Sequence, residues 1–536
     1  MLRNVLGAYL DNVTERALDL PLMALLAAMG FVDIHYTHGQ VEFGKDFIAK
    51  RIEAAGAVQY SFQSKAGDIS QAEWRNSIQG QLLEAVLTPL VHPNFDASLP
   101  HQVVLVTTGD LRGNAALEMQ SLNARIAQKY HERPILLWSR ENLLDHFEQH
   151  GLSSVHQVTA AGLTDYAQFF LVHGRALQGM LSEREIEAYT QRWLRKEADW
   201  EHRLFRATIE AEMVAQQCST NGYGYEAIMV HLGLIRMLLD AVYTEGADAY
   251  LRELYTQAVG RLHERCTAYL AEVQHRWQQE RNLLIATNGA VSMTTYLVQC
   301  ARIMDVAALT YFLTDSEEVR RQAAALVEAL VREEPGCAHP LSDRYAISIV
   351  LATLILCDCH HYDLARDLLA CTTIWLCDRA EEGMGLASFE ANEVEETLTL
   401  LGYPFEGIAI ANIGGSLLAA ALCDLAAFVG DSDLYGDIVN DIKACHILPE
   451  YWQPVDSAGV CRIDGEDVIA YPNVRYVDTL TTFDDFTFAD HIPHESDSFR
   501  IVDVFGLSTL VVLMVLLRDR SFPKLWHRLT PNHRAA

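Results

Sequence analysis

The hydrophobic pattern of the chain changes near residue 150, and this change limits what each part can fold into. Before it, short apolar runs with strand-like alternation are interspersed with helical spacings. The predicted order over residues 1–155 is α-β-β-β-α-β-α-β-α, which indicates a mixed sheet flanked by helices on both faces. After it, long amphipathic segments with short loops predict an all-α region. We therefore expect an α/β domain followed by a helical solenoid or bundle.

The helical region is expected to cover residues 156–445, without a recognisable repeat consensus. Residues 446–536 form a third segment, which we expect to pack on the helical region. Its first part is rich in proline, acidic and aromatic residues, a composition typical of loops and short strands. A last core helix is predicted at 507–517.

One apolar run, residues 407–430, is long enough to cross a bilayer. It contains Asn412 and Asp424, and no Lys or Arg lies between Arg379 and Lys443 to anchor it. A buried helix is the better interpretation, so no membrane partner is expected. The acidic start of the chain lacks the apolar core of an export signal, and the eleven cysteines have no disulfide-like spacing. We expect a cytoplasmic protein.

The net charge of −30 is unevenly distributed. Residues 1–155 contain 12 basic and 17 acidic residues, a net charge of −5, which leaves −25 for residues 156–536. Such a surface repels nucleic acid except within a local groove. The acidic helical region is instead expected to bind a protein partner or a second copy of the chain.

The strongest chemical signal lies on two neighbouring predicted strands. Asp46 opens one strand, and Gln63 and Lys65 stand two residues apart on the next. Phosphodiester hydrolysis needs a hard cation held by oxygens and a positive group near the scissile phosphate. Asp46 and Gln63 offer the oxygens, while Lys65 offers the charge. Taken alone, these residue types are more often an ordinary solvated strand face.

The surrounding segments favour the catalytic interpretation. The runs LLAAMGF, HGQVEFGKDFIAKR, VQYSFQSKAGDIS and VVLVTTG resemble, in this order, the PD-(D/E)xK restriction endonuclease-like fold. More narrowly they are similar to Mrr-like restriction endonucleases, whose signature pairs Gly-x-Asp with Gln-x-Lys. The resemblance covers residues 10–150. It implies that Asp46 is the metal carboxylate, that Gln63 replaces the usual acid, that Lys65 is the catalytic lysine and that Mg²⁺ or Mn²⁺ is the cofactor.

The same site needs a second carboxylate for tight Mg²⁺ binding, and three residues qualify. Glu42 ranks first, because a hairpin could fold it towards Asp46. Asp19 matches the helix acid of Mrr-like proteins, although Asp19 followed by Pro21 equally predicts a helix N-cap. Glu15 qualifies if that helix begins earlier.

Substrate contacts are expected from the helix after the catalytic strand and from nearby cations. Gln81, with Gln79 as its neighbour, lies on that helix, which often approaches DNA in this fold. Mrr-like proteins have a small residue directly before this aspartate, whereas this chain has Lys45 before Asp46. The basic residues that we expect to line one phosphate-binding groove are Lys45, Lys50, Arg51, Lys65, Arg75 and Arg112.

Three other clusters resemble metal sites only superficially. Residues 357–361 (CDCHH) lack a second ligand pair at finger spacing and predict a buried helix end. Pro493 prevents the helix that would align His491 and His494, and the acidic aromatic run 483–490 predicts a surface loop.

These observations predict a metal-dependent DNA endonuclease that serves as a bacterial restriction or anti-phage effector. Its helical region would sense a trigger or bind a partner. RNA is the alternative substrate for the same site. The alternative from another class is a catalytically decayed nuclease domain that acts as a non-enzymatic adaptor.

Overall fold

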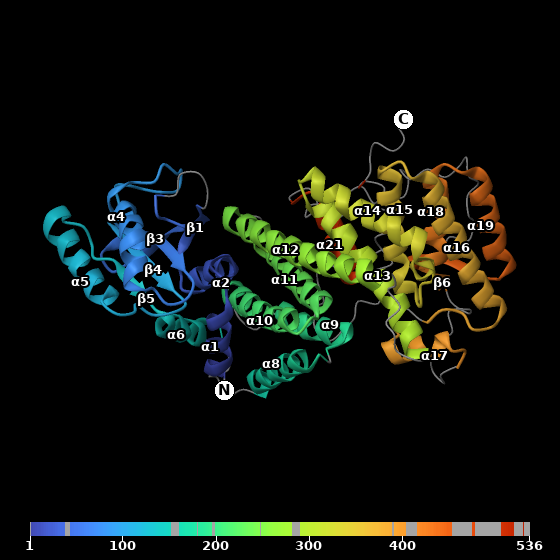
Figure 1. The fold of residues 1–536 in the computed structure, drawn as a ribbon, viewed down its shortest axis with the longest axis horizontal. Helices are drawn as coiled ribbons and strands as arrows, with labels where there is room; N and C mark the ends of the chain where they lie inside the picture. Colours follow the sequence, from blue (N-terminus) through green and yellow to red (C-terminus); the bar gives the residue numbers. More distant parts are fainter. Residues whose placement is uncertain are drawn as a thin grey trace. The chain divides into compact units, whose positions relative to one another are not determined.

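The computed structural model describes residues 2–37, 43–151, 160–179, 181–195, 199–246, 248–280, 290–387, 391–403, 415–452, 474–476, 505–518 and 529. The chain divides into two compact units, Met1–Arg261 and Leu262–Ala536. The first unit holds the sheet and extends past the domain boundary expected at residue 155. Figure 1 shows both units, which are described separately below.

The first unit is built on a mixed five-stranded sheet with strand order β1-β2-β3-β4-β5. Its strands are β1 (Val32–Tyr36), β2 (Phe47–Glu53), β3 (Gly56–Lys65), β4 (His101–Thr107) and β5 (Leu136–Trp138). The first three strands are antiparallel neighbours, whereas β3, β4 and β5 run parallel. The predicted mixed sheet is confirmed.

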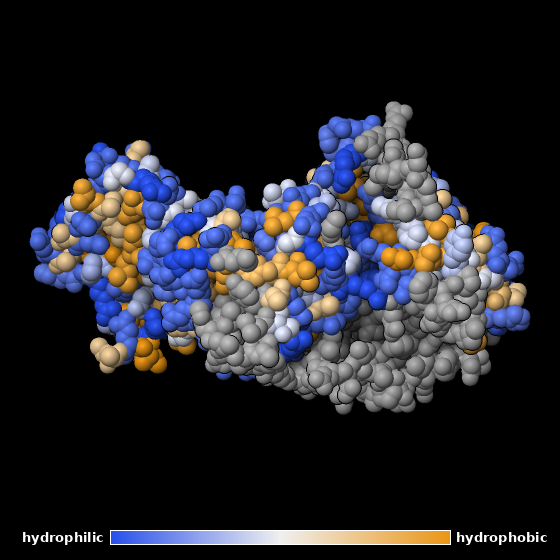
Figure 2. Space-filling model, turned by 90° about the horizontal axis from the view of Figure 1, so that it is seen from below, coloured by the Kyte–Doolittle hydropathy of each residue, from blue (hydrophilic) through white to orange (hydrophobic). Residues whose placement is uncertain are grey.

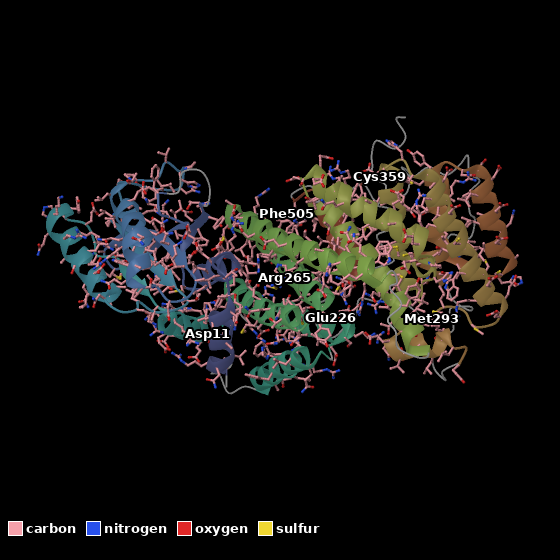
Figure 3. All side chains as sticks on the ribbon, viewed as in Figure 1. Asp11, Glu226, Arg265, Met293, Cys359 and Phe505 are labelled. Atoms are coloured by element: carbon pink, nitrogen blue, oxygen red, sulfur yellow. The ribbon has the colours of Figure 1, made fainter. Side chains whose placement is uncertain are left out.

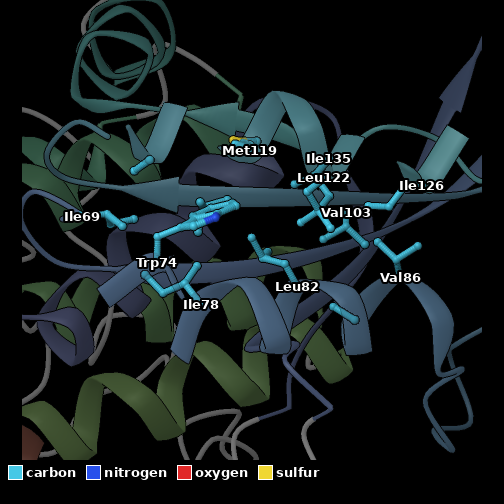
Figure 4. Packing of buried hydrophobic residues seen from close by; sticks show 13 residues of the cluster. Ile69, Trp74, Ile78, Leu82, Val86, Val103, Met119, Leu122, Ile126 and Ile135 are labelled. Atoms are coloured by element: carbon cyan, nitrogen blue, oxygen red, sulfur yellow. The ribbon is translucent and has the colours of Figure 1, made fainter. Parts of the chain in front are cut away.

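One face of the sheet is covered by the helices that follow β3 and β4. The first combines α3 (Gln71–Glu73), a π turn (Trp74–Ile78) and α4 (Gln79–Leu87). The second is α5 (Ala115–Arg125), continued by a π turn to Tyr130. Together with β4 they form a hydrophobic core around Trp74, which is fully buried (Figure 4).

The opposite face carries Phe62 of β3, because adjacent strand residues point to opposite faces. The Phe62 ring lies 5.6 Å from Phe31, which follows α2 (Glu15–Ala28), and 5.4 Å from Trp138. Trp138 in turn contacts His146 of α6 (Arg140–Gly151). Helices therefore flank both faces, with α5 and α2 on opposite sides of the sheet (Figure 1).

The expected start of α2 at Asp19 is wrong. Thr14 caps this helix, since its hydroxyl accepts a hydrogen bond from the amide of Ala17, and α2 begins at Glu15. Pro21 consequently lies inside the helix instead of in its first turn. The helix ends as expected before Gly30, whose φ of +81° favours glycine. A preceding helix, α1 (Leu2–Asn12), was not predicted.

The remaining helices of the first unit follow α6 along the chain. They are α8 (Ala160–Gln178), α9 (Glu183–Gln191), α10 (Trp200–Thr220), α11 (Gly224–Glu245) and the first part of α12 (Ala249–Glu280). α10 packs against α2 and α6, where the Phe147 and Phe205 rings lie 5.5 Å apart. The hydroxyl of Tyr250 in α12 donates to the carbonyl oxygen of Met23 in α2 at 3.2 Å. The helical segment is thus part of the same compact unit as the sheet.

The second unit is largely helical, as predicted. Beyond α12 its helices are α13 (Ala290–Leu313), α14 (Glu317–Glu333), α15 (Ala346–Asp358), α16 (Tyr362–Glu381), α17 (Glu393–Leu400), α18 (Leu417–Val429), α19 (Ser432–Ala444) and α21 (Ser508–Leu517). Three short strands, β6 (Gly415–Ser416), β7 (Leu448–Trp452) and β8 (Val474–Tyr476), form a small sheet.

Apolar helices of the second unit are buried within it. The described part of the apolar run at 407–430 forms α18, whose side chains from Leu417 to Phe428 are buried. Among the described helices, only Met293–Leu313 is long and apolar enough to cross a membrane, and 72% of its most apolar window is buried. On the face shown in Figure 2, hydrophilic side chains are interspersed with smaller apolar patches.

Candidate active site

The loop before β2 makes a close approach to α4. Gly44 has a φ of +68°, and a Cβ at this position would lie 2.3 Å from the backbone carbonyl oxygen of Gln81 and 3.2 Å from Oε1 of Gln63. A side chain is therefore excluded twice, by space and by backbone conformation. Glycine here allows the loop to bring Asp46, two residues later, against β3.

Asp46 is held by hydrogen bonds from β3 and is 6% exposed. Its Oδ2 accepts from the amide of Ser64 at 2.6 Å, from the Ser64 hydroxyl at 3.2 Å and from Nε2 of Gln63 at 3.3 Å. Burial raises the pKa of Asp46, although the Ser64 amide and the charge of Lys65 act in the opposite direction. The carboxylate is fixed in position but incompletely neutralised.

Gln63 presents a carbonyl oxygen without a donor. The side chain is 3% exposed, and its Oε1 is buried with no hydrogen-bond partner among the described residues. A buried acceptor without a donor is costly, because desolvation is not compensated. The Asp46 carboxylate and this amide oxygen are the hard ligands that Mg²⁺ or Mn²⁺ prefers, so the residues present fit such an ion.

Lys65 lies at the carboxyl end of β3 and forms an ion pair with α2, the helix on the face of the sheet opposite α5. Its Nζ donates to Oε1 of Glu15 at 3.0 Å, at the first position of α2. Lys65 also interacts electrostatically with Asp46. The early start of α2 is what brings Glu15 to this position.

Asp19, one turn after Glu15 on α2, is buried and accepts a hydrogen bond from the Tyr36 hydroxyl at 3.0 Å. The pKa of Asp19 is raised to about 7, mainly by burial and also by the charges of Asp46 and Glu15, against the effect of the Tyr36 hydrogen bond. The carboxylates of Asp19, Asp46 and Glu15 thus interact electrostatically near β2 and β3. Glu42, the first-ranked second carboxylate, lies outside the described residues.

We expect Asp19→Asn to stabilise the metal-free protein increasingly as the pH rises. The folded protein binds a proton on Asp19 more tightly than the unfolded chain, whose Asp pKa is about 3.9. Stability is therefore lost as the pH rises from about 4 to 7, and the amide removes this loss. Thermal unfolding in EDTA should show a stabilisation by Asp19→Asn that is larger at pH 8 than at pH 5.5 by about 2 kcal/mol. An equal shift at both pH values would contradict the prediction.

Two of the expected substrate contacts are engaged elsewhere. Lys45 is completely buried; its Nζ donates to the carbonyl oxygens of Thr88 at 2.7 Å and Phe43 at 3.4 Å. Burial lowers the pKa of Lys45 to about 8. The structure places this amine at the carboxyl end of α4, where a cation is favourable. Arg75 is exposed, but its Nε donates to Glu118 of α5 at 2.9 Å.

Gln81 does lie beside the candidate site. Its backbone carbonyl abuts Gly44, and its Oε1 is buried without a hydrogen-bond partner among the described residues. Two features of the site were not anticipated from the sequence, the Ser64 hydroxyl on Asp46 and the Tyr36 hydroxyl on Asp19. Tyr36 occupies a strand position whose orientation depends on the register of β1.

Within the described parts of the chain, no three His, Cys, Asp or Glu side chains are grouped to hold one metal ion. A cation at Asp46 would therefore depend on the Gln63 amide oxygen, with water or substrate as its other ligands.

Cys357 is buried, which raises the pKa of its thiol to about 12, and Cys359, labelled in Figure 3, lies just after α15. Residues 483–495 lie outside the described residues.

No family model, curated protein or solved structure matches this chain. Evidence for the function of the first unit therefore comes from its own sheet and side chains.

Proposed function

We propose that the first unit is a metal-dependent nuclease of the PD-(D/E)xK type that hydrolyses phosphodiester bonds in DNA. The observation that supports this proposal best is the convergence at β2 and β3. The Gln63 amide donates to Asp46 there through Nε2 and keeps a donor-free Oε1, and Lys65 interacts electrostatically with Asp46. Carboxylate, neutral oxygen and ammonium are the groups that metal-assisted phosphodiester hydrolysis requires.

Each residue has a separate task in this proposal. Asp46 and Gln63 would hold Mg²⁺ or Mn²⁺, which when bound supplies stabilisation of negative charge on the phosphate. Lys65 orients the attacking water through Nζ and balances the charge that develops on the phosphate oxygens. To do so, its Nζ must exchange the contact with Glu15 for a contact with water or substrate. Of the three candidates for a second carboxylate, Asp19 and Glu15 interact electrostatically with Asp46, although the described side chains are not grouped to hold one ion.

We further propose that the helical region senses a trigger or binds a partner, in a cytoplasmic restriction or anti-phage role. This part of the proposal is an analogy with other nucleases of this fold that carry large non-catalytic regions. The physical support is the contact of α10 and α12 with α2, the helix that carries Glu15 and Asp19.

The test is cleavage of plasmid DNA and of a single-stranded RNA by the full chain, in Mg²⁺, Mn²⁺ or EDTA. We expect metal-dependent cleavage of DNA that falls at least about 100-fold in Lys65→Met, since one charged catalytic group contributes about 10²–10⁴-fold. The matched control is Lys129→Met, which removes an exposed lysine after α5.

Two results would redirect the proposal. Cleavage of RNA alone would reassign the substrate while keeping the site. Absence of metal-dependent cleavage, or equal cleavage by wild type and Lys65→Met, would contradict nuclease function and favour the adaptor.

A further inference from the structure

The cations that were expected to form a phosphate-binding groove are occupied within the protein. Lys50 pairs with Asp33 at 2.9 Å, Arg112 pairs with Asp68 at 2.8 Å, and Lys65 pairs with Glu15. Arg75 binds Glu118 and Lys45 is buried, as described above. Arg51 lies over the ring of Phe31, 5.1 Å from its centroid. Apart from Arg51, the expected groove therefore offers little uncompensated positive charge.

Arg16 differs from the five cations that are paired with acids or buried, and unlike Arg51 its side chain is exposed. It is exposed in the first turn of α2, directly after Glu15, and forms no ion pair with a described residue. Its guanidinium is nevertheless close enough to interact electrostatically with Asp19 and Tyr36. A positive charge beside the catalytic cluster is thus available to an incoming anion.

The chemistry of Arg16 suits a phosphate. A guanidinium donates two parallel hydrogen bonds to phosphate oxygens and stays charged at every physiological pH. At the start of α2 it adds to the positive end of the helix dipole.

We propose that Arg16 contacts a DNA phosphate adjacent to the cleaved bond and positions the strand across Asp46 and Lys65. This inference rests on the proposed nuclease function and extends it to a residue outside the Gly-x-Asp and Gln-x-Lys pattern. Arg16 is a positioning residue: it provides affinity and register for the backbone without reading bases.

The test is the salt dependence of DNA binding by the full chain. A fluorescein-labelled DNA duplex is titrated by anisotropy across a salt series, in the Asp46→Asn background to prevent cutting. Each phosphate contact contributes a slope of about 0.9 to log K against log salt concentration. We expect Arg16→Gln to reduce the slope by about 1 and to weaken binding several-fold at low salt. Arg16→Lys should keep the slope, because it retains the charge.

The matched control is Arg125→Gln, which removes an exposed arginine from the end of α5, on the opposite side of the sheet. Arg125→Gln should match the parent in both affinity and slope. An unchanged affinity and slope in Arg16→Gln, with measurable duplex binding, would overturn the assignment of Arg16 and leave the nuclease proposal intact. If the parent neither binds the duplex nor, as wild type, cleaves DNA, the proposed function falls and the role of Arg16 falls with it.

Discussion

Asp46→Asn should abolish DNA cleavage without loss of folding stability. The carboxylate is the only charged oxygen that accepts hydrogen bonds from Gln63 and Ser64 at the described site. A neutral amide of the same shape still accepts these bonds but cannot balance a divalent cation. We expect a loss of at least about 1,000-fold in the cleavage rate, near the upper part of the range for one catalytic group.

The stability of this variant distinguishes a catalytic effect from unfolding. Burial raises the pKa of Asp46, so the charged form is unfavourable in the folded protein at pH 8. The amide removes this cost, and the melting temperature should equal or exceed that of the wild type. Asp33→Asn is the control, since Asp33 is an exposed acid whose positive φ also suits asparagine. Cleavage by Asp46→Asn within tenfold of the wild-type rate would exclude Asp46 as the metal carboxylate.

The strands of the first unit could be predicted from the sequence because their signals are local. Alternating residues from Val58 to Lys65 predict β3, and the Ser70 cap predicts the start of α3, where Ser70 accepts from the Glu73 amide. The same reasoning failed for α2. Asp19 has the residue type of an N-cap, but its partner is Tyr36 in a strand, a contact that no local pattern reveals.

The predicted set of groove cations overlooked their ion pairs for a related reason. Arg75 and Glu118 are 43 residues apart, and Lys65 and Glu15 are 50 apart, so the pairing of these charges depends on tertiary packing. Counting cations along the chain overestimates the positive charge that is free to bind an anion. Lys45 shows the limit most clearly, because a lysine is expected at the surface and this one is buried on the carbonyl of Thr88.

The apolar composition of α2 indicates that a further element must pack against this helix. Its residues from Ala17 to Leu26 are buried on every side, which one sheet face cannot achieve for a helix. A second layer of structure must cover the far side, and α10 provides it. The sequence pattern of α2 therefore predicts a partner element, but not which one.

Truncation after residue 155 should abolish folding of the domain that contains the five-stranded sheet. Without α10 and α12, α2 loses the layer that packs against its far side, including the hydrogen bond from Tyr250 to Met23. Exposing a large apolar side chain costs about 1.5–3 kcal/mol, so exposing four costs about 6–12 kcal/mol, which is comparable to the stability of about 5–15 kcal/mol of a typical domain. The fragment 1–155 should show no cooperative unfolding transition and should bind a hydrophobic dye.

The fragment 1–261 is the matched comparison, because it ends where the first compact unit ends. We expect it to unfold cooperatively in thermal denaturation followed by circular dichroism. Cooperative unfolding of 1–155 with a melting temperature close to that of 1–261 would show that α10 is dispensable for the fold. If the shorter fragment fails as expected, a perturbation of α10 or α12 reaches Glu15 and Asp19 through α2 itself. The helical segment then acts on the site by direct packing, and control of cleavage needs no separate linker.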